Sequence, residues 1–468
     1  MVLSRIWASF IIIAILAAIV QCFLPGRNQD IFSRMVTGKS GDTSRTTTVD
    51  SAMLSPIIVK TLNSSKEVKA GNEKIIKTAD NRIIRFHEQA ADGIIATCKS
   101  AVELSINLIG IMALFMGFMS IAERAGGIRL LSKLIGPFFS KLFPEIPIGH
   151  PSLGHMMMNF SANLLGLDNA ATPFGIKAMQ SLQEINPNKD TASNPQIMFL
   201  CLHASGLTLI PVSIIAARAS LRSANPTDIF VPCMIATFLS TIAAMLIVSY
   251  KQRINIFQPL ILAWVGGLSI MIACLVVYLH SLPYTGVQTF SSILSNGLIL
   301  LIFLSIIAGG LYKNINIFDA FVDGAKNGFE TAVRIIPYLV GMLVAISMLR
   351  TSGTFDVIIH GMKQVFGAFG TDTRFVDGLP TALIKPLSGS GARGMMIDTM
   401  KANSPDSFAG RLACILQGSS DTTFYVIAVY FGAVSIRNTR YAIGTMLLAD
   451  LVGIISSIIL CYLFFGNG

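Results

Sequence analysis

Long apolar runs without a single charge are the feature that most restricts how this chain can fold. Leu104–Ala122, Ile229–Tyr250 and Phe257–His280 contain no Asp, Glu, Lys or Arg. A helix needs about 20 apolar residues to cross the hydrocarbon core of a bilayer. Charged residues make up only 13% of the chain, against about a quarter in soluble domains. The sequence therefore predicts an all-α, polytopic membrane protein.

Further apolar runs, some with one or two polar residues, are Ile6–Leu24, Phe199–Ala217, Ser291–Tyr312, Ala332–Leu349, Leu412–Val434 and Tyr441–Phe465. Together the runs predict about nine transmembrane helices, in addition to broken or re-entrant helices. We interpret the first run as a retained anchor rather than a cleaved signal peptide. The reason is that no convincing small-residue cleavage site stands before the polar stretch that follows it.

Charge and motif content argue against several classes of protein. The net charge of +10 comes from basic residues in loops, where the positive-inside rule accounts for them, so no nucleic-acid partner is expected. The seven cysteines lie mostly in apolar runs without a CxxC pair, which disfavours a disulfide or zinc framework. His150 and His155 have no carboxylate at zinc-ligand spacing, and Ser388–Gly394 lacks the lysine of a phosphate loop. With no nucleophile–His–acid pattern either, we expect no enzyme, no metal site and no cofactor.

Short loops predict the orientation in the membrane. Lys251–Arg253 and the pair Arg437 and Arg440 are expected in the cytoplasm, and the uncharged loop 281–290 is expected outside. The N-terminus is then inside and the C-terminus outside. Residues 26–90 are rich in Ser, Thr, Lys and Asp, so we interpret them as a polar, partly disordered loop on the outer side.

An internal repeat divides the chain. Asp92-Gly93 and Gly110 recur as Asp323-Gly324 and Gly341, both at an offset of 231 residues. A second echo, at an offset of 215, places Gly418–Thr423 over His203–Thr208. In the predicted orientation the matching helices run in opposite directions, which is typical of transporters built from inverted repeats. A duplicated scaffold without a pore is the alternative.

The predicted domain plan has five parts. They are an N-terminal transmembrane helix at 1–25, the polar loop at 26–90, a first repeat at 91–255, a joining transmembrane helix at 256–284 and a second repeat at 285–468.

Two polar stretches, 156–179 and 379–400, do not suit helices that face lipid. Asn159–Pro173 and Leu387–Gly394 mix Gly and Pro with Asn, Ser and Thr. Gly and Pro interrupt a helix and free backbone polar groups, which survive at membrane depth only inside protein or beside a cavity. We therefore predict that both stretches line a cavity; surface loops between helices are the alternative.

Asp421 is the most informative single residue, because a carboxylate at the centre of a membrane helix costs about 2.5–3.5 kcal/mol by insertion scales. We expect it to face the interior, where it binds a cation, accepts a substrate hydroxyl or pairs with Arg393; a purely structural ion pair is the alternative. Ser and Thr on the companion helices also join membrane helices to one another. The predicted substrate-binding candidates are Asn159, Asn163, Asp168, Asn169, Thr172, Ser205, Thr208, Ser388, Ser390, Arg393, Gln417, Ser420, Asp421 and Thr423.

Several of these motifs resemble known families. Asn163–Pro173 followed by Gly206–Pro211 resembles the spore maturation protein A family. Four other segments resemble the spore maturation protein B family: Ile335–Val340, Pro386–Gly394, Gln417–Tyr425 and Ile436–Arg440. The chain is thus similar to a head-to-tail fusion of the two, apart from residues 26–90 and the joining helix.

Both families belong to the nucleoside-recognition, or Gate, domain family, which also includes the membrane part of ferrous iron transporter B proteins. The resemblance implies a transport or gating role in the bacterial inner (plasma) membrane. Our hypothesis is a transporter or channel for a small polar solute, nucleoside-like or other, whose site lies between two inverted Gate-type repeats. A non-transporting membrane scaffold or maturation factor for the cell envelope or spore is the alternative. The expected partners are the lipid bilayer and the solute, and the sequence leaves a homo-oligomer open.

Overall fold

The structure is a computed structural model. It describes residues 2–23, 31–38, 43–49, 67–70, 73–77, 83–88, 93–147, 149–164, 168–206, 208, 210–282 and 284–466. These residues belong to two compact units. The first comprises residues 1–3, 102–342 and 362–468, and the second comprises residues 4–101 and 343–361.

Seven helices of the described residues are long and apolar enough to cross a membrane, which agrees with the predicted all-α, multi-pass class. The uninterrupted ones are α4 (Ile94–Arg124), α10 (Phe230–Gln252), α11 (Pro259–Ser281), α12 (Tyr284–Tyr312), α13 (Ile317–Thr351) and α19 (Ala442–Phe465). The seventh, over Phe408–Ala433, is interrupted in its middle. The N-terminal helix α1 (Val2–Phe23) has a shorter apolar segment at Trp7–Phe23.

The order of elements in the first half, α4 to α10, returns in the second half, α13 to α19. Between the long helices of the first half lie α5 (Gly127–Leu142), α6 (Pro151–Leu164), α7 (Asp168–Glu184), α8 (Asn194–Ser205) and α9 (Val212–Ser220). Their counterparts are α14 (Thr354–Ala368), α15 (Leu379–Ile384), α16 (Gly389–Asn403), α17 (Phe408–Gly418) and α18 (Thr423–Ala433), with the short 3-10 helix η2 (Arg374–Asp377) before α15. The order matches the repeat predicted from the sequence; that the two halves are inverted stays a prediction.

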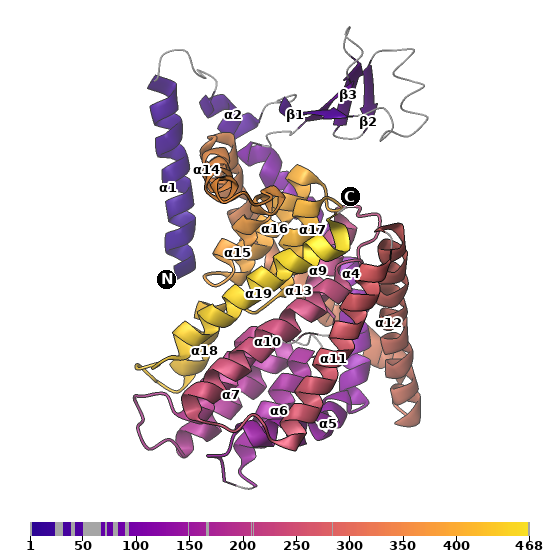
Figure 1. The fold of residues 1–468 in the computed structure, drawn as a ribbon, viewed down its shortest axis with the longest axis vertical. Coiled ribbons are helices and arrows are strands. Elements are labelled where there is room, and N and C mark those ends of the chain that lie inside the picture. The colour runs from indigo at the N-terminus through magenta and orange to yellow at the C-terminus, as the bar shows by residue number, and fades with distance from the viewer. Residues whose placement is uncertain are drawn as a thin grey trace. The chain divides into compact units, whose positions relative to one another are not determined.

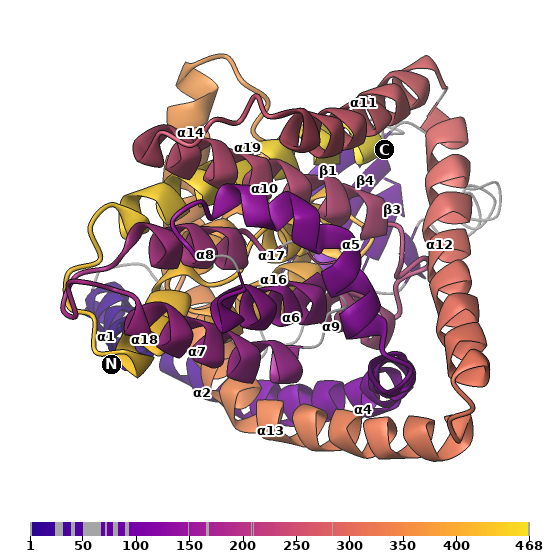
Figure 2. The same ribbon diagram turned by 90° about the horizontal axis from the view of Figure 1, so that it is seen from below.

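Neighbouring helices of the first unit pack in pairs. The helices α6 and α7 form an antiparallel hairpin, and α10 packs along α19, the last helix of the other half (Figures 1 and 2). At the second contact the Ser240 hydroxyl donates to the Ala449 carbonyl at 3.1 Å. A cluster of buried hydrophobic residues lies around α8 and includes Phe199, Met198 and Tyr430. The core therefore joins residues of both halves.

The second unit contains a sheet that the sequence did not predict. Within the segment expected to be a polar, partly disordered loop, the strands β1 (Thr43–Val49), β2 (Glu67–Ala70), β3 (Glu73–Lys77) and β4 (Ile83–Glu88) pair antiparallel in the order β1-β4-β3-β2. Each strand is short and carries few apolar residues, so the period-two alternation that marks a strand is weak. Composition alone therefore did not reveal these strands.

In the same unit, side chains of α1 and α2 (Ile31–Thr37) donate hydrogen bonds to backbone carbonyl groups at the C-terminal end of α13. The last carbonyls of a helix have no partner within the helix. The Arg34 guanidinium donates to the Thr351 carbonyl at 2.7 Å, and the Gln21 amide donates to the Ser352 carbonyl at 2.7 Å. This pairing ties the N-terminal helices to the end of α13.

Two glycines let α13 approach α4 closely within the first unit. A Cβ atom added at Gly324 would lie 2.3 Å from the Met116 carbonyl oxygen, and one at Gly328 would lie 2.7 Å from the Ala113 Cα. Small residues four apart allow membrane helices to come into backbone contact. The close crossing therefore depends on these two positions.

The substitution Gly328→Ala is expected to destabilise the protein by about 1–3 kcal/mol, the usual cost of overpacking, because the neighbour is backbone that cannot rotate away. Gly297→Ala in α12 is the matched control, since a Cβ there meets nothing within 4 Å. Thermal unfolding of both variants in the same detergent measures the difference. An equal melting temperature for the two variants would show that the crossing has room to spare.

A buried cluster of charges joins the two halves outside the long helices. Arg218, in α9, is fully buried and lies 2.8 Å from an Asp228 oxygen and 3.0 Å from an Asp406 oxygen. Arg411, in α17, holds the second Asp228 oxygen at 2.8 Å and also donates to the Asp406 carbonyl. Arg218 further donates to the Pro405 carbonyl at 2.6 Å. The loop after α9 is thus fixed to the loop between α16 and α17.

The Asp406 carboxylate has a lowered pKa. Partial burial acts to raise it, but the Ala224 N–H, the Ser223 hydroxyl and the charge of Arg218 outweigh that effect. A carboxyl whose folded pKa lies below its unfolded value of about 3.9 stabilises the fold above that value, and the contribution is lost as pH falls through the folded pKa.

The melting temperature of wild type is therefore expected to exceed that of Asp406→Asn at pH 7, with the gap closing below about pH 4. Differential scanning fluorimetry from pH 3 to pH 8 checks this, with Asp190→Asn, an exposed carboxylate, as the control. A gap that stays constant down to pH 3 would contradict the assignment.

Candidate functional site

Helix interruptions from both halves meet in the first unit. One separates α8 from α9, one separates α15 from α16, and one separates α17 from α18. The Asp421 N–H donates to the Ala204 carbonyl at 2.7 Å, and the Phe424 N–H donates to the Pro386 carbonyl at 3.0 Å. Each interruption therefore supplies partners for backbone groups that another leaves free, as a low-dielectric surrounding requires.

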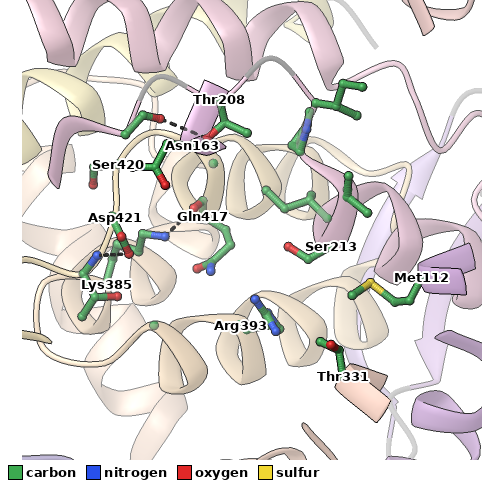
Figure 3. Close-up of a pocket in the computed structure, with 18 of the residues that line it drawn as sticks. Met112, Asn163, Thr208, Ser213, Thr331, Lys385, Arg393, Gln417, Ser420 and Asp421 are labelled. Carbon is green, nitrogen blue, oxygen red and sulfur yellow. Dashed lines mark hydrogen bonds between the residues drawn. The ribbon is translucent and has the colours of Figure 1, made fainter. Parts of the chain in front are cut away.

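A cavity of about 280 Å³ lies where these interruptions meet (Figure 3). Its polar lining residues are Asn163, His203, Thr208, Ser213, Thr331, Lys385, Arg393, Gln417, Ser420, Asp421 and Thr422. Its apolar lining includes Met112, Met116, Ile210, Pro211, Val212 and Ile214. In Figure 3, Asp421 and Lys385 lie toward one end of the cavity and Met112 and Thr331 lie toward the other. The lining therefore mixes polar and apolar side chains.

Asp421 is the one acid among the described residues that line this cavity. Its side chain is 48% exposed, and its carboxylate lies 4.0 Å from Nε2 of the buried His203. Nδ1 of the same imidazole lies 3.0 Å from the Asn159 amide oxygen and 2.8 Å from the Asn163 amide nitrogen. The ring is held between two amides of α6 and presents its other nitrogen to Asp421.

Two basic side chains line the same space. Lys385 follows α15, is 7% exposed and donates to the Gln417 carbonyl at 2.5 Å, so its ammonium caps the C-terminal end of α17. Arg393 projects from α16 beside the cavity. Ser388 fixes the start of α16, because its hydroxyl accepts the Gly391 N–H at 3.0 Å. The positive charges therefore come from the two sides of the interruption between α15 and α16.

Gln417 carries an unsatisfied group. The residue is 7% exposed, and its side-chain oxygen has no hydrogen-bond partner among the residues that the structure describes. A buried polar atom without a partner costs about 1–3 kcal/mol. Because Gln417 lines the cavity, a donor in the cavity would satisfy this oxygen.

The structure brings together six of the predicted substrate-binding residues. These are Asn163, Thr208, Arg393, Gln417, Ser420 and Asp421, which all line the cavity. Their roles in binding stay predictions. They come from α6, from the α8–α9 interruption and from the second half. Thr208, Ser420 and Asp421 lie in the second of the two repeat echoes.

Three other predicted residues are buried and do not line the cavity. Asn159 supports His203 and donates to the Ala171 carbonyl at 2.7 Å. The Ser205 hydroxyl donates to the Leu202 carbonyl of its own helix at 2.8 Å, and the Thr423 hydroxyl donates to the buried Asp450 carboxylate at 2.6 Å.

Five predicted residues remain. Ser388 is the N-cap of α16, and Ser390 lies 3.3 Å from its hydroxyl. Thr172 is half-buried in α7. The side chains of Asp168 and Asn169 lie outside the described residues.

The sequence interpretation missed several lining residues, among them Lys385, Ser213, Thr331 and Thr422, and treated His203 as packing. Only Lys385 carried a usable signal, since it is a basic residue inside a stretch placed at membrane depth. No group of three or more His, Cys, Asp and Glu side chains that could hold a metal occurs in the described part of the chain.

Comparisons with known proteins agree with this architecture. The family model for nucleoside recognition, called Gate, matches residues 105–257 and 332–437, which is more than half of the chain. Spore maturation protein B of Bacillus subtilis (strain 168) is 48% identical over 174 residues, covering 96% of that protein and 37% of this chain. Spore maturation protein A of the same organism is 43% identical over 152 residues, covering 78% of that protein and 32% of this chain. No solved structure matches.

Each relative matches part of the chain, which is consistent with a fusion of an A-type and a B-type protein. The family match and the apolar helices lead to one conclusion: the chain belongs to the nucleoside-recognition (Gate) family and is a multi-pass membrane protein.

Proposed function

We propose that this protein carries a small polar solute across the bacterial inner (plasma) membrane through the cavity between its two halves. The observation that supports this most is the meeting of helix interruptions from both halves around a cavity lined by Asp421, Lys385 and Arg393. Charged side chains and broken helices at membrane depth are costly and mark solute pathways.

The repeated order of elements fits the same proposal. Transporters of inverted repeats place their site at the repeat interface, on helices broken near the middle of the membrane. In this proposal α4–α10 and α13–α19 are inverted copies that open the cavity to each side in turn. The protein acts without covalent chemistry, cofactor or metal, its partners are lipid and solute rather than nucleic acid, and a homo-oligomer is compatible with it.

Alternating access can be tested without knowing the solute. Thr208→Cys and Ser420→Cys are introduced separately into a variant in which the seven native cysteines, including the exposed Cys274, are replaced. A membrane-impermeant thiol reagent is expected to label both positions from either side of a proteoliposome. Ser457→Cys, at a fully buried position in α19, is the unlabelled control. Labelling of both cavity positions from one side only, together with no flux for any solute, would contradict transport.

The sheet supports a second function, that of a scaffold for an envelope or spore partner. In the described residues its outer strands β1 and β2 are paired on one side only, and open edges can pair with another chain. Deleting residues 43–88 removes the sheet and keeps α2. If a cell carrying this deletion shows the null phenotype while solute flux is intact, the scaffold is favoured; if Asp421→Asn gives that phenotype with the sheet intact, transport is favoured.

A further inference from the structure

We infer that the cavity binds a ligand besides the solute: a single proton, held between Nε2 of His203 and the carboxylate of Asp421. The proton site depends only on the geometry around these two residues. Its use as the coupling ion, through which a proton gradient drives the solute, rests on the proposed function.

Asn159 determines which nitrogen of the His203 imidazole carries its proton. The Asn159 side chain is fully buried, and its amide nitrogen donates to the Ala171 carbonyl at 2.7 Å. Because a carbonyl only accepts, the Asn159 amide cannot be reversed, and its oxygen faces Nδ1 of His203 at 3.0 Å. An amide oxygen also only accepts, so Nδ1 carries the proton and Nε2 of the neutral ring has a lone pair.

Two further side chains hold the ring in this orientation. The Asn163 amide lies 2.8 Å from the same Nδ1. Reversing a side-chain amide exchanges its nitrogen and oxygen at nearly equal shape, so Asn163 accepts from the Nδ1–H with its oxygen turned to the ring. Tyr430 packs against the imidazole in a T-shaped arrangement, with the ring centroids 4.7 Å apart.

Nε2 and the Asp421 carboxylate therefore face each other as two acceptors. Nε2 lies 4.0 Å from Oδ2 of Asp421, which is longer than a hydrogen bond. A proton on Nε2 converts this gap into a charge-assisted hydrogen bond, whose usual length is about 2.7–2.9 Å. The Asp421 side chain is half exposed on the cavity wall, so it has room to close the gap.

The bound proton joins the two halves of the chain. His203 belongs to α8 in the first half, and Asp421 lies between α17 and α18 in the second. Protonation therefore strengthens a contact at the place where the helix interruptions meet, and loss of the proton weakens it. A ligand shifts a conformational equilibrium through its different affinity for the two states, so a proton that binds across this contact can drive a change between them.

His203 also lies on the walls of two cavities. A second cavity, of about 60 Å³, shares His203, Asn163 and Gly206 with the larger one. The rest of its lining is mostly apolar and comes from α5, α6, α8 and α10. This position suits a group that receives a proton from one side and releases it to the other.

Other charged groups around the pair shift the pH at which the proton binds. Lys385 and Arg393 share the cavity wall with Asp421, and Asp450 of α19 is buried, where it accepts from the Thr423 hydroxyl. Cations oppose an added proton and carboxylates favour it, so these residues act in opposing directions. The helices α6, α7, α10, α18 and α19 pack against α8. Their other acidic, basic and histidine residues with described side chains are His155, which is hydrogen-bonded to Ser181, and the exposed Lys177, Glu184 and Lys251.

NMR of the purified full-length protein, with nitrogen-15 in the histidine rings, tests the site directly. The chain has six histidines, and the His203 signal is the one that disappears in His203→Gln. Glutamine replacements at the other five positions identify it by elimination if that variant does not fold. At about pH 9 we expect the Nδ1–H tautomer, with uptake of one proton at Nε2 as the pH falls to about 4. An Nε2–H tautomer at the higher pH, or no uptake over this range, overturns the inference.

The variant Asp421→Asn tests the partner of the imidazole. The midpoint of proton uptake by His203 is expected to be at least about one pH unit higher in wild type than in this variant, because a carboxylate at this range stabilises the imidazolium. Asp190→Asn removes an exposed carboxylate outside the cavity and should leave the midpoint unchanged. Equal midpoints in wild type and Asp421→Asn would also overturn the inference.

Uptake into proteoliposomes separates this inference from the proposed function. The panel contains amino acids, hydroxy acids, nucleosides and divalent metals. Any transported member is expected to enter at least about fivefold faster with a proton gradient than after a protonophore collapses it, and the residual flux of Asp421→Asn should not depend on the gradient. Flux that ignores the gradient keeps transport and overturns the coupling. A proton at Nε2 without flux of any solute keeps the proton site and overturns transport.

Discussion

Replacing Arg218 by methionine is expected to lower the free energy of unfolding by about 3–5 kcal/mol, the usual cost of removing one partner from a buried ion cluster. Arg218 is fully buried and serves Asp228 and Asp406 at once. Methionine fills a similar volume, so the loss reflects the two carboxylates left behind rather than a cavity. A loss of this size equals a large part of the net stability of a typical protein.

The measurement is chemical or thermal unfolding in detergent, together with the yield of monodisperse protein. Arg222→Met is the matched control, because Arg222 is exposed and lies in the same loop region. The triple variant Arg218→Met, Asp228→Asn, Asp406→Asn removes the stranded charges and should recover part of the loss. If the single variant unfolds like wild type, the cluster does not hold the two halves together.

The second large effect is expected at Asp421, where Asn should reduce solute flux about 10- to 100-fold, since a hydrogen bond to a charged group contributes about 1.5–3 kcal/mol. Asn has nearly the same shape, and the backbone bond from residue 421 to the Ala204 carbonyl does not need the charge. The fold should therefore survive while the charge that faces the cavity is lost.

Initial uptake rates into proteoliposomes, measured over a panel of amino acids, hydroxy acids, nucleosides and divalent metals, test this expectation. Asp190→Asn removes a carboxylate that lies outside the cavity and controls for the change in net charge. A melting temperature close to that of wild type shows that the Asp421→Asn protein is folded. Unchanged flux of every transported solute in this variant would remove Asp421 from the transport pathway.

Much of the fold was predictable because uncharged runs of membrane length admit few alternatives. Leu104–Ala122 and Ser291–Tyr312 fall on α4 and α12. The break between α15 and α16 falls in the predicted stretch 379–400. The breaks at Gly206 and Ser420 were not predicted, because Phe199–Ala217 and Leu412–Val434 were interpreted as apolar membrane runs. The sheet at 43–88 was not predicted either, because its strands are held by backbone pairing that leaves a weak mark on the sequence.

The cavity itself was predictable only in part. Thr208 and Asp421 stand out because polar residues are expensive at that depth. His203 and Lys385 are positioned by contacts between residues that are far apart in the sequence. His203 faces Asp421 of the other half, and Lys385 caps the C-terminal end of α17. Such contacts depend on how the helices pack, and the packing of helices cannot be predicted from a single sequence.

The helices α11 and α12 connect the two halves, and α11 takes little part in their packing, since only 6% of its most apolar window is buried. The covalent connection instead fixes the stoichiometry of the two halves. Two separate subunits would have to be made in equal amounts and find each other in the membrane, whereas a short covalent link holds them at an effective concentration on the order of millimolar. One translation product thus supplies both walls of each cavity in a one-to-one ratio, at any level of expression.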